Sequence, residues 1–316
     1  MGKVLTHIKK FVRDLEEAKK MIQGNQIPQY PKQIHIEITT KCNLNCVICP
    51  IQDVRKNRGD PLTDNEIISL IWQAADLGME YIDFVNYGEP LLHPGWFDFV
   101  SLANFIMGQG RVGMVTNGTI MNQDIAEKFL ASRFHLLYFS VDAFTKETYE
   151  RMRPGVDRDQ VYENVNFYLD FLDKRRVENY PPIIAMTICD HNFQEVDQFV
   201  EYWQKKRVHE RTFLCTGRGG EKPFTTSNSN SCNVLLDGMW ILNDGRCTVC
   251  CEDWRGIQTV GNIRQDSLRN IWNNDQFQDF RIKQFEQRKC DIELCKNCHT
   301  SMDIGAHNSY YNWKLG

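Results

Sequence analysis

The chain has 316 residues, of which 42% are hydrophobic and 25% are charged, and its formal net charge is −4. This composition predicts a globular protein, long enough for one large domain and one small one. The slight acidity gives no general attraction to nucleic acid or to an anionic membrane surface, so we expect neither as a partner. The sequence shows no apolar segment of membrane-spanning length and no signal peptide.

The chain contains twelve cysteines. Because the N-terminus carries no export signal, we expect a cytoplasmic protein, and thiols stay reduced in that compartment. Clustered cysteines in a reducing compartment usually serve metal or redox chemistry. Metal or cluster ligation is therefore the leading prediction for most of them.

Short apolar strands alternate with longer helices along most of the chain. Residues 1–30 begin with apolar positions at helical spacing, which predicts an N-terminal helix. Strands are predicted at 34–38, 81–85, 112–116, 136–141, 183–188 and 211–215, and helices at 64–77, 96–107, 123–131, 160–176 and 193–206. This alternation is typical of parallel strands with crossover helices. The predicted fold class is α/β, with a partial (β/α)6 TIM-like barrel over residues 31–222.

The composition changes after the last predicted strand. Glycines at 217–220 and a run of Ser, Asn and Thr at 225–231 indicate a linker. We predict that a small second domain spans residues 228–316. It holds seven of the twelve cysteines.

Three cysteines, Cys42, Cys46 and Cys49, follow the first predicted strand with the spacing C-x3-C-x2-C. Three thiolates on one short loop can hold three irons of a 4Fe-4S cubane, whereas full ligation by protein takes four. The fourth iron would then be open for chemistry. A structural zinc site is the competing interpretation, but zinc takes four ligands and no fourth lies nearby in the sequence.

This cysteine loop, placed after a first barrel strand, resembles the radical S-adenosylmethionine (SAM) superfamily. The resemblance implies that the open iron chelates the amino and carboxylate groups of SAM. Electron transfer would then break a carbon–sulfur bond and give the 5'-deoxyadenosyl radical, which abstracts hydrogen from a substrate. One position departs from the family pattern, because many members have an aromatic residue before the third cysteine and this chain has Ile48.

Further motifs similar to those of the family follow later predicted strands. The resemblance assigns Gly88 and Glu89 to the amino end of SAM, and Asn117 and Ser140 to its ribose and methionine parts. It assigns Arg153 to the SAM carboxylate, which a guanidinium can hold with two parallel hydrogen bonds. Each motif alone is equally consistent with a turn or a surface pair. Their order and their placement at strand ends, where barrels carry their sites, favour a SAM site.

The cysteine-rich C-terminal region resembles the auxiliary-cluster extensions called SPASM and twitch domains, and the chain is similar to radical SAM enzymes of the 2-deoxy-scyllo-inosamine dehydrogenase type. No cysteine follows Cys298, so one auxiliary cluster is a better count than two. The twitch pattern implies four ligands for a 4Fe-4S cluster: Cys232, Cys250, Cys295 and Cys298. The predicted cofactors are therefore SAM and two 4Fe-4S clusters.

The choice of Cys250 over Cys247 or Cys251 as a ligand is open, because only alternate side chains of a strand face the same side. A four-cysteine zinc site is the alternative for this domain, since iron–sulfur clusters and zinc use the same thiolates.

Two reactions are consistent with these sites. If an oxidised auxiliary cluster accepts an electron while a base removes a proton, a secondary alcohol becomes a ketone. If a thiol returns a hydrogen atom to the opposite face, the carbon is epimerised. Glu252 and Asp253 are candidates for proton transfer, Arg218 is a polar candidate at the barrel mouth, and Cys251 or Cys247 is the candidate hydrogen donor. A solvated turn or simple packing is the alternative role for each.

The sequence shows no separate peptide-recognition domain, so a small polar substrate such as a sugar, aminosugar or cyclitol is favoured. Radical SAM modification of a ribosomally made peptide, by crosslinking, thioether formation or epimerisation, is the alternative. A non-enzymatic, zinc-stabilised binding protein is the third interpretation. The expected protein partner is an electron donor such as flavodoxin or ferredoxin.

Overall fold

The computed structural model describes residues 29–177, 182–206, 208–214, 232, 234–296 and 298. Almost all of the predicted N-terminal helix lies outside these residues, as do the predicted linker and Arg218. Within the described part of the chain, no helix has the length and apolar character needed to cross a bilayer.

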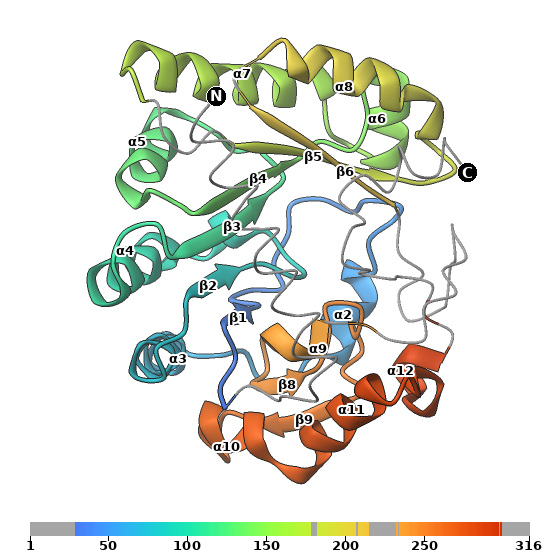
Figure 1. The fold of residues 1–316 in the computed structure, drawn as a ribbon. Coiled ribbons are helices and arrows are strands. Elements are labelled where there is room, and N and C mark those ends of the chain that lie inside the picture. The colour runs from blue at the N-terminus through green and yellow to red at the C-terminus, as the bar shows by residue number, and fades with distance from the viewer. Residues whose placement is uncertain are drawn as a thin grey trace.

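One curved sheet of nine strands forms the centre of the described fold, in the order β6-β5-β4-β3-β2-β1-β7-β8-β9 (Figure 1). Strands β1 to β6 are all parallel and lie in chain order. They are β1 (Gln33–Ile36), β2 (Tyr81–Phe84), β3 (Val112–Thr116), β4 (Leu136–Ser140), β5 (Ile183–Ile188) and β6 (His209–Leu214). This arc confirms the predicted α/β partial barrel.

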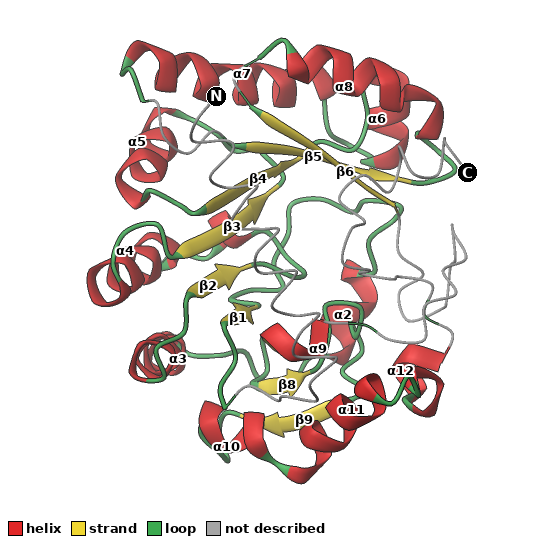
Figure 2. Ribbon diagram, viewed as in Figure 1, coloured by secondary structure: helices red, strands yellow, loops and turns green. Residues whose placement is uncertain are grey.

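Helices connect successive parallel strands, and those from α3 to α8 lie on the outer face of the arc (Figure 2). They are α2 (Ile51–Asn57), α3 (Asp64–Asp76), α4 (Trp96–Met107), α5 (Gln123–Ser132), α6 (Lys146–Met152), α7 (Arg158–Lys174) and α8 (Val196–Gln204), with short 3-10 turns η1 (Pro90–Leu92) and η2 (Phe193–Glu195). Helices α2 and α6 were not predicted from the sequence, and they have only seven residues each. Helices this short show too little of the 3.6-residue period.

The alternation of side chains along β1 separates the core from the inner face of the arc. Ile34 and Ile36 are fully buried in the main hydrophobic core. His35, between them, lies 3.2 Å from the carboxylate of Asp83 on β2 and stacks on Trp240, with ring centroids 4.3 Å apart. The inner face of the arc is therefore partly polar.

The C-terminal region continues the sheet of the barrel, which the sequence analysis did not predict. Strand β7 (Gly238–Ile241) pairs in parallel with β1, and β8 (Arg246–Thr248) and β9 (Thr259–Asn262) add an antiparallel hairpin. The remaining elements are α9 (Val234–Asp237), α10 (Leu268–Asn273), α11 (Asp275–Phe285), η3 (Lys289–Asp291) and α12 (Glu293–Lys296). Because β7 lies beside β1, the C-terminal cysteines are held next to the loop that leaves β1.

Candidate active site

The loop after β1 carries Cys42, Cys46 and Cys49, all partly buried. Its backbone is fixed from two sides. Arg55 on α2 donates hydrogen bonds to the carbonyls of Thr40 and Cys42, at 3.1 and 2.9 Å. The N–H of Val47 donates to the carbonyl of the last residue of α6 at 2.9 Å. The loop therefore presents its three cysteines from a fixed backbone.

The three thiols lie close enough to influence one another's ionisation. Burial raises the pKa of Cys46 to about 11, partly opposed by the charge of Arg153, and the neighbouring thiols Cys49 and Cys42 raise it further. Burial also raises the pKa of Cys42. Such thiols become ligands only when a metal displaces their protons, as cluster assembly requires.

Gly88 lets two site loops pack against each other. It has a φ of +101°, and a Cβ there would lie 2.1 Å from the carbonyl oxygen of Thr39 and 3.2 Å from that of Lys41. The next residue, Glu89, donates its N–H to the Lys41 carbonyl at 2.8 Å. Only glycine permits this approach, so Gly88 positions the backbone that leads into the cysteine loop.

The Glu89 carboxylate is 1% exposed and is fully engaged by the protein. It accepts hydrogen bonds from the Thr116 hydroxyl at 2.8 Å, from the Asn117 N–H at 2.7 Å and from the Leu91 N–H at 3.2 Å. Burial raises its pKa. In this structure Glu89 holds the loop after β3, and its predicted contact with the amino end of SAM stays a prediction.

Asn117 joins the loop after β3 to the cysteine loop. Its Nδ2 donates to Asn43 Oδ1 at 3.0 Å and lies 4.0 Å from Cys42 Sγ. Thr119 donates to Asn117 Oδ1 from its N–H at 3.0 Å and from its hydroxyl at 2.6 Å. The Asn117 side chain is therefore aimed at the first cysteine of the motif.

Arg153 is a buried cation with an unused donor. Its side chain is 3% exposed, and Nη2 donates to Asp142 at 2.5 Å, while Nη1 lies 3.5 Å from the Tyr149 hydroxyl. Its Nε is buried, and no described residue accepts from it. Ser140, the last residue of β4, is half-buried two residues before Asp142. The Arg153 guanidinium lies close to Cys46 and keeps one buried N–H group without an acceptor among the described residues. Such a group can bind a ligand that carries a carboxylate.

The predicted auxiliary ligands surround one cavity. It is lined by Cys232, Val234, Leu235, Cys250, Cys251, Glu252, Lys289, Leu294, Cys295 and Cys298. All four thiols of the predicted set are among them, and Cys251 is a fifth. Cys251 and burial together raise the pKa of Cys250 well above its usual range, and burial raises that of Cys295 to about 12.

Cys247 does not line this cavity. It is fully buried in the main core on β8, with its thiol 3.9 Å from the carbonyl of Gly245, and burial raises its pKa. A hydrogen-donor role would need access to a substrate, and this position offers none within the described fold.

Glu252 and Asp253 differ in their surroundings. Glu252 lines the cavity, and its Oε1 lies 3.8 Å from Cys251 Sγ. Asp253 is buried and accepts hydrogen bonds from the Thr248 hydroxyl at 2.6 Å and from two N–H groups, those of Ile257 and Gln258, at 2.8 and 2.9 Å. Asp253 therefore organises the turn after β8, and Glu252 is the carboxylate available at the cavity.

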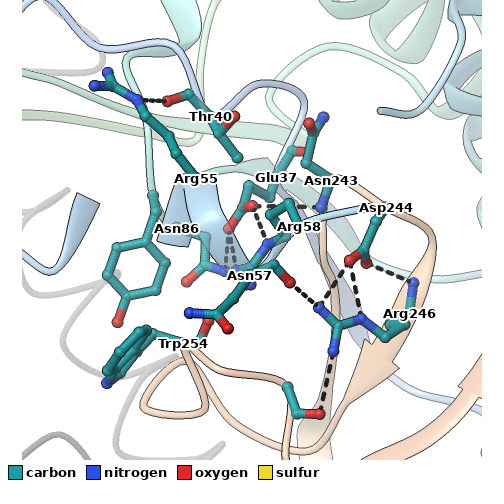
Figure 3. A network of polar contacts seen from close by, with 12 residues as sticks. Glu37, Thr40, Arg55, Asn57, Arg58, Asn86, Asn243, Asp244, Arg246 and Trp254 are labelled. Atoms are coloured by element: carbon teal, nitrogen blue, oxygen red, sulfur yellow. Dashed lines mark hydrogen bonds and ion pairs between the residues drawn. The ribbon is translucent and has the colours of Figure 1, made fainter. Parts of the chain in front are cut away.

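Two links that the sequence analysis missed join the cysteine loop to the C-terminal region. Arg58, after α2, contacts both oxygens of the buried Glu37 carboxylate and donates to the Trp254 carbonyl at 2.7 Å (Figure 3). Tyr87 donates its hydroxyl to the Cys251 carbonyl at 3.3 Å. No local signal marks these pairs, because their partners are more than 150 positions apart.

A small hydrophobic cluster lies between the two thiol sites. Ile51, Val54 and Trp254 form its buried part, and Cys42, Cys49 and Tyr87 pack against it. Two cysteines of the loop thus pack against the cluster that includes Trp254, and Trp254 follows Glu252 of the cavity by two residues.

The thiol-only donor sets fit iron–sulfur clusters. Among the described residues, no three Cys, His, Asp or Glu side chains converge as ligands of a single metal ion would. A zinc site draws four ligands to about 2.3 Å from one ion. A cubane takes one thiolate for each iron and so spreads its ligands. Thiolates are the ligands that iron–sulfur clusters take, so the donor sets at both sites suit such clusters.

Comparison with known proteins agrees with this interpretation. Residues 36–202 match the radical SAM superfamily model, and residues 232–299 match the SPASM model, described as an iron-sulfur cluster-binding domain. The chain belongs to the radical SAM superfamily, and is a radical SAM enzyme with a C-terminal SPASM-type region. The predicted family is confirmed, and this family binds iron–sulfur clusters and SAM.

Its relatives include enzymes with different reactions. The chain is 22% identical over 274 residues to an S-adenosyl-L-methionine-dependent 2-deoxy-scyllo-inosamine dehydrogenase from Niallia circulans, covering 84% of this chain and 92% of that enzyme. It is 29% identical over 197 residues to an AdoMet-dependent heme synthase from Methanosarcina barkeri, covering 60% of this chain and 53% of the relative. The chain thus spans about half the length of the heme synthase.

Solved structures share the fold. BtrN in complex with AdoMet and 2-DOIA has a TM-score of 0.60 at 19% identity, covering 85% of this chain and 93% of BtrN. Streptococcus suis SuiB bound to precursor peptide SuiA has a TM-score of 0.66 at 13% identity, covering 96% of this chain and 77% of SuiB. At these identities the likeness concerns the fold alone.

Proposed function

We propose that this radical SAM enzyme oxidises a carbinol carbon of a small polar substrate, a sugar, aminosugar or cyclitol, and that an auxiliary 4Fe-4S cluster accepts one electron from the substrate radical. The observation that carries the proposal is the cavity lined by Cys232, Cys250, Cys295 and Cys298. Four thiolates saturate a cubane, which makes it an electron carrier with no open corner for substrate. Similarity to a cyclitol dehydrogenase along most of both chains supports the same reaction class.

Each electron, hydrogen atom and proton of the proposed oxidation has a donor and an acceptor. When bound, the cluster at Cys42, Cys46 and Cys49 and SAM supply the 5'-deoxyadenosyl radical, at the cost of one electron from a donor such as flavodoxin or ferredoxin. Transfer of the carbinol hydrogen atom to that radical would give 5'-deoxyadenosine and a substrate radical. A cluster held by Cys232, Cys250, Cys295 and Cys298 would supply an acceptor for the remaining electron, and a base would take the hydroxyl proton, which would leave the ketone.

The residues of the chain have distinct roles in this proposal. Arg153 uses its free Nε to hold the carboxylate of SAM. Asn117, held by Asn43 and supported by Glu89, orients the same molecule beside Cys42. Glu252 at the auxiliary cavity is the candidate proton acceptor, because Asp253 is engaged by the turn.

Epimerisation is the second candidate, and one observation favours it. Cys251 lines the auxiliary cavity without belonging to the proposed ligand set, and its thiol lies 3.8 Å from a carboxylate oxygen of Glu252. A thiol there can return a hydrogen atom to a substrate radical, and one electron from the donor and one proton then restore the thiol from the thiyl radical that is left. In that reaction no electron leaves the substrate.

The two reactions are separated by product analysis in heavy water. The candidate sugars, aminosugars and cyclitols are incubated with reconstituted enzyme, SAM and a reductant. A carbonyl product without solvent deuterium supports dehydrogenation, and a deuterated epimer that disappears in Cys251→Ala supports epimerisation. Turnover of a ribosomal peptide, with no turnover of any small polyol, would contradict the proposed substrate class.

A further inference from the structure

The auxiliary cavity contains a buried cation that the reaction described above does not use. Lys289, on η3, is 6% exposed and lines the cavity. Its Nζ donates to the Cys298 carbonyl at 3.2 Å. Among the described residues, no carboxylate lies within ion-pair distance of it. A buried charge is usually paired, so this ammonium indicates an anionic occupant of the cavity.

The neighbouring charges do not compensate Lys289. Arg288, the preceding residue, is exposed and pairs with Glu286 at 2.6 Å and with Asp291 at 2.7 Å. Lys289 is the only cation among the described residues that line the cavity, and Glu252 is the only carboxylate. The positive charge of Lys289 acts on Cys295, where it opposes the rise in pKa that burial causes.

A second buried side chain spans two of the proposed ligands. Gln284 on α11 is 2% exposed and accepts a hydrogen bond from the Cys232 N–H at 2.7 Å. Its Nε2 lies 4.0 Å from Cys295 Sγ, within reach of an N–H to sulfur hydrogen bond. One turn earlier, Arg281 anchors α11 by donating to the carbonyl of Leu235, another lining residue, at 3.1 Å.

We propose that Lys289 and Gln284 raise the reduction potential of the auxiliary cluster and so make it a better electron acceptor. Reduction adds one negative charge to an already anionic cluster. A nearby ammonium and an N–H donor to a ligand sulfur stabilise the reduced form more than the oxidised form. The inference rests on the proposed auxiliary cluster, and both residues are positioning residues that act through the ligands.

The test is a redox titration, monitored by electron paramagnetic resonance, in a background where Cys42, Cys46 and Cys49 are all replaced by Ala. Only the auxiliary cluster then contributes to the signal. Lys289→Met removes the charge, Lys289→Gln keeps a donor for the Cys298 carbonyl without the charge, and Gln284→Glu keeps the acceptor for Cys232 while losing the donor to sulfur. The matched control is Lys296→Met, which removes an exposed charge one residue from Cys295.

We expect the midpoint potential to become more negative in the three test variants and to stay unchanged in Lys296→Met. Unchanged potentials in Lys289→Gln and Gln284→Glu, with about four irons retained, would overturn the inference and leave the two-cluster proposal intact. A triple-Ala background that binds no iron would instead overturn the auxiliary cluster itself. If Lys289→Met fails to assemble a cluster, the other two variants still decide the outcome.

Discussion

Arg58 donates hydrogen bonds to both carboxylate oxygens of Glu37, at 2.8 and 3.1 Å, and neither side chain is more than 3% exposed. Burial raises the pKa of Glu37, and Arg58 opposes that rise. Because Arg58 also holds the Trp254 carbonyl, the pair joins the start of the cysteine loop to the turn beside the auxiliary cavity (Figure 3).

Replacing Arg58 by Met should therefore be strongly destabilising. It leaves the buried Glu37 carboxylate without its cation, which typically costs about 3–5 kcal/mol. Lys205→Met, which breaks an exposed pair with Glu201, should cost no more than about 1 kcal/mol. Denaturant unfolding of both variants measures the loss in free energy of unfolding. Equal losses would show that the Arg58–Glu37 pair does not hold the cysteine loop to the turn beside the auxiliary cavity.

Gly88→Ala should prevent assembly of the cluster at the cysteine loop. Its Cβ would collide with the Thr39 carbonyl, and that backbone cannot move without displacing the loop. Gly108→Ala is the matched control, because Gly108 also has a positive φ, of +91°, but has open space around its Cβ. We expect Gly108→Ala to lose about 1–3 kcal/mol of stability from backbone strain and to retain its iron. Iron analysis after reconstitution distinguishes them, and full iron in Gly88→Ala would refute the packing role.

Arg153→Lys should weaken SAM binding. A lysine keeps a positive charge beside Asp142 but cannot offer the planar donor set of a guanidinium. Loss of one charge-assisted hydrogen bond, about 1.5–3 kcal/mol, predicts a rise of about ten- to hundredfold in the KM for SAM. Arg158→Lys, which affects a guanidinium stacked on Tyr162, is the control and should leave this KM unchanged. An unchanged KM in Arg153→Lys would remove Arg153 from the SAM site.

Asp83 predicts a dependence of stability on pH. Burial alone would raise its pKa, but hydrogen bonds from His135 and His35 hold that pKa below its usual value. Asp83 therefore stabilises the fold above its unfolded-state pKa of about 3.9, and this contribution is lost as the pH falls toward the folded-state pKa.

Asp83→Asn should accordingly lower the free energy of unfolding near pH 7. The difference in free energy of unfolding between this variant and the native protein should become smaller below about pH 4. Cluster-free protein is used for both, so that release of iron by acid does not contribute. Asp76→Asn, at an exposed position, should change little. If the difference in free energy of unfolding stays constant from pH 7 to pH 3, ionised Asp83 does not stabilise the fold as proposed.

Local patterns predicted the strands and helices that have a clear period. Strands β3 and β5 and helix α4 have the predicted bounds. The pairing of β7 with β1 was missed, because it joins residues about 205 positions apart, such as Gln33 and Gly238, and no local pattern encodes it. The short helices α2 and α6 were missed for lack of length.

The site was predictable where one motif supplies it and unpredictable where partners come from distant elements. The spacing of Cys42, Cys46 and Cys49 is local. Cys247 lies in the main core, and the pairing of β8 with β9 has an irregular register between Cys247 and Thr248, which simple alternation along a strand does not predict. The engagement of Glu89 by Thr116 of β3 and by the N–H of Asn117 after it likewise became visible only in the folded chain.

The most direct test measures SAM cleavage in the anaerobically reconstituted protein. With a strong reductant, the native sequence should hold about eight irons and convert SAM to 5'-deoxyadenosine and methionine. The variant in which Cys42, Cys46 and Cys49 are all Ala should hold about four irons and form no 5'-deoxyadenosine. Continued cleavage by that variant, or no cleavage by fully loaded native protein, would contradict an open-cornered cluster on the loop after β1.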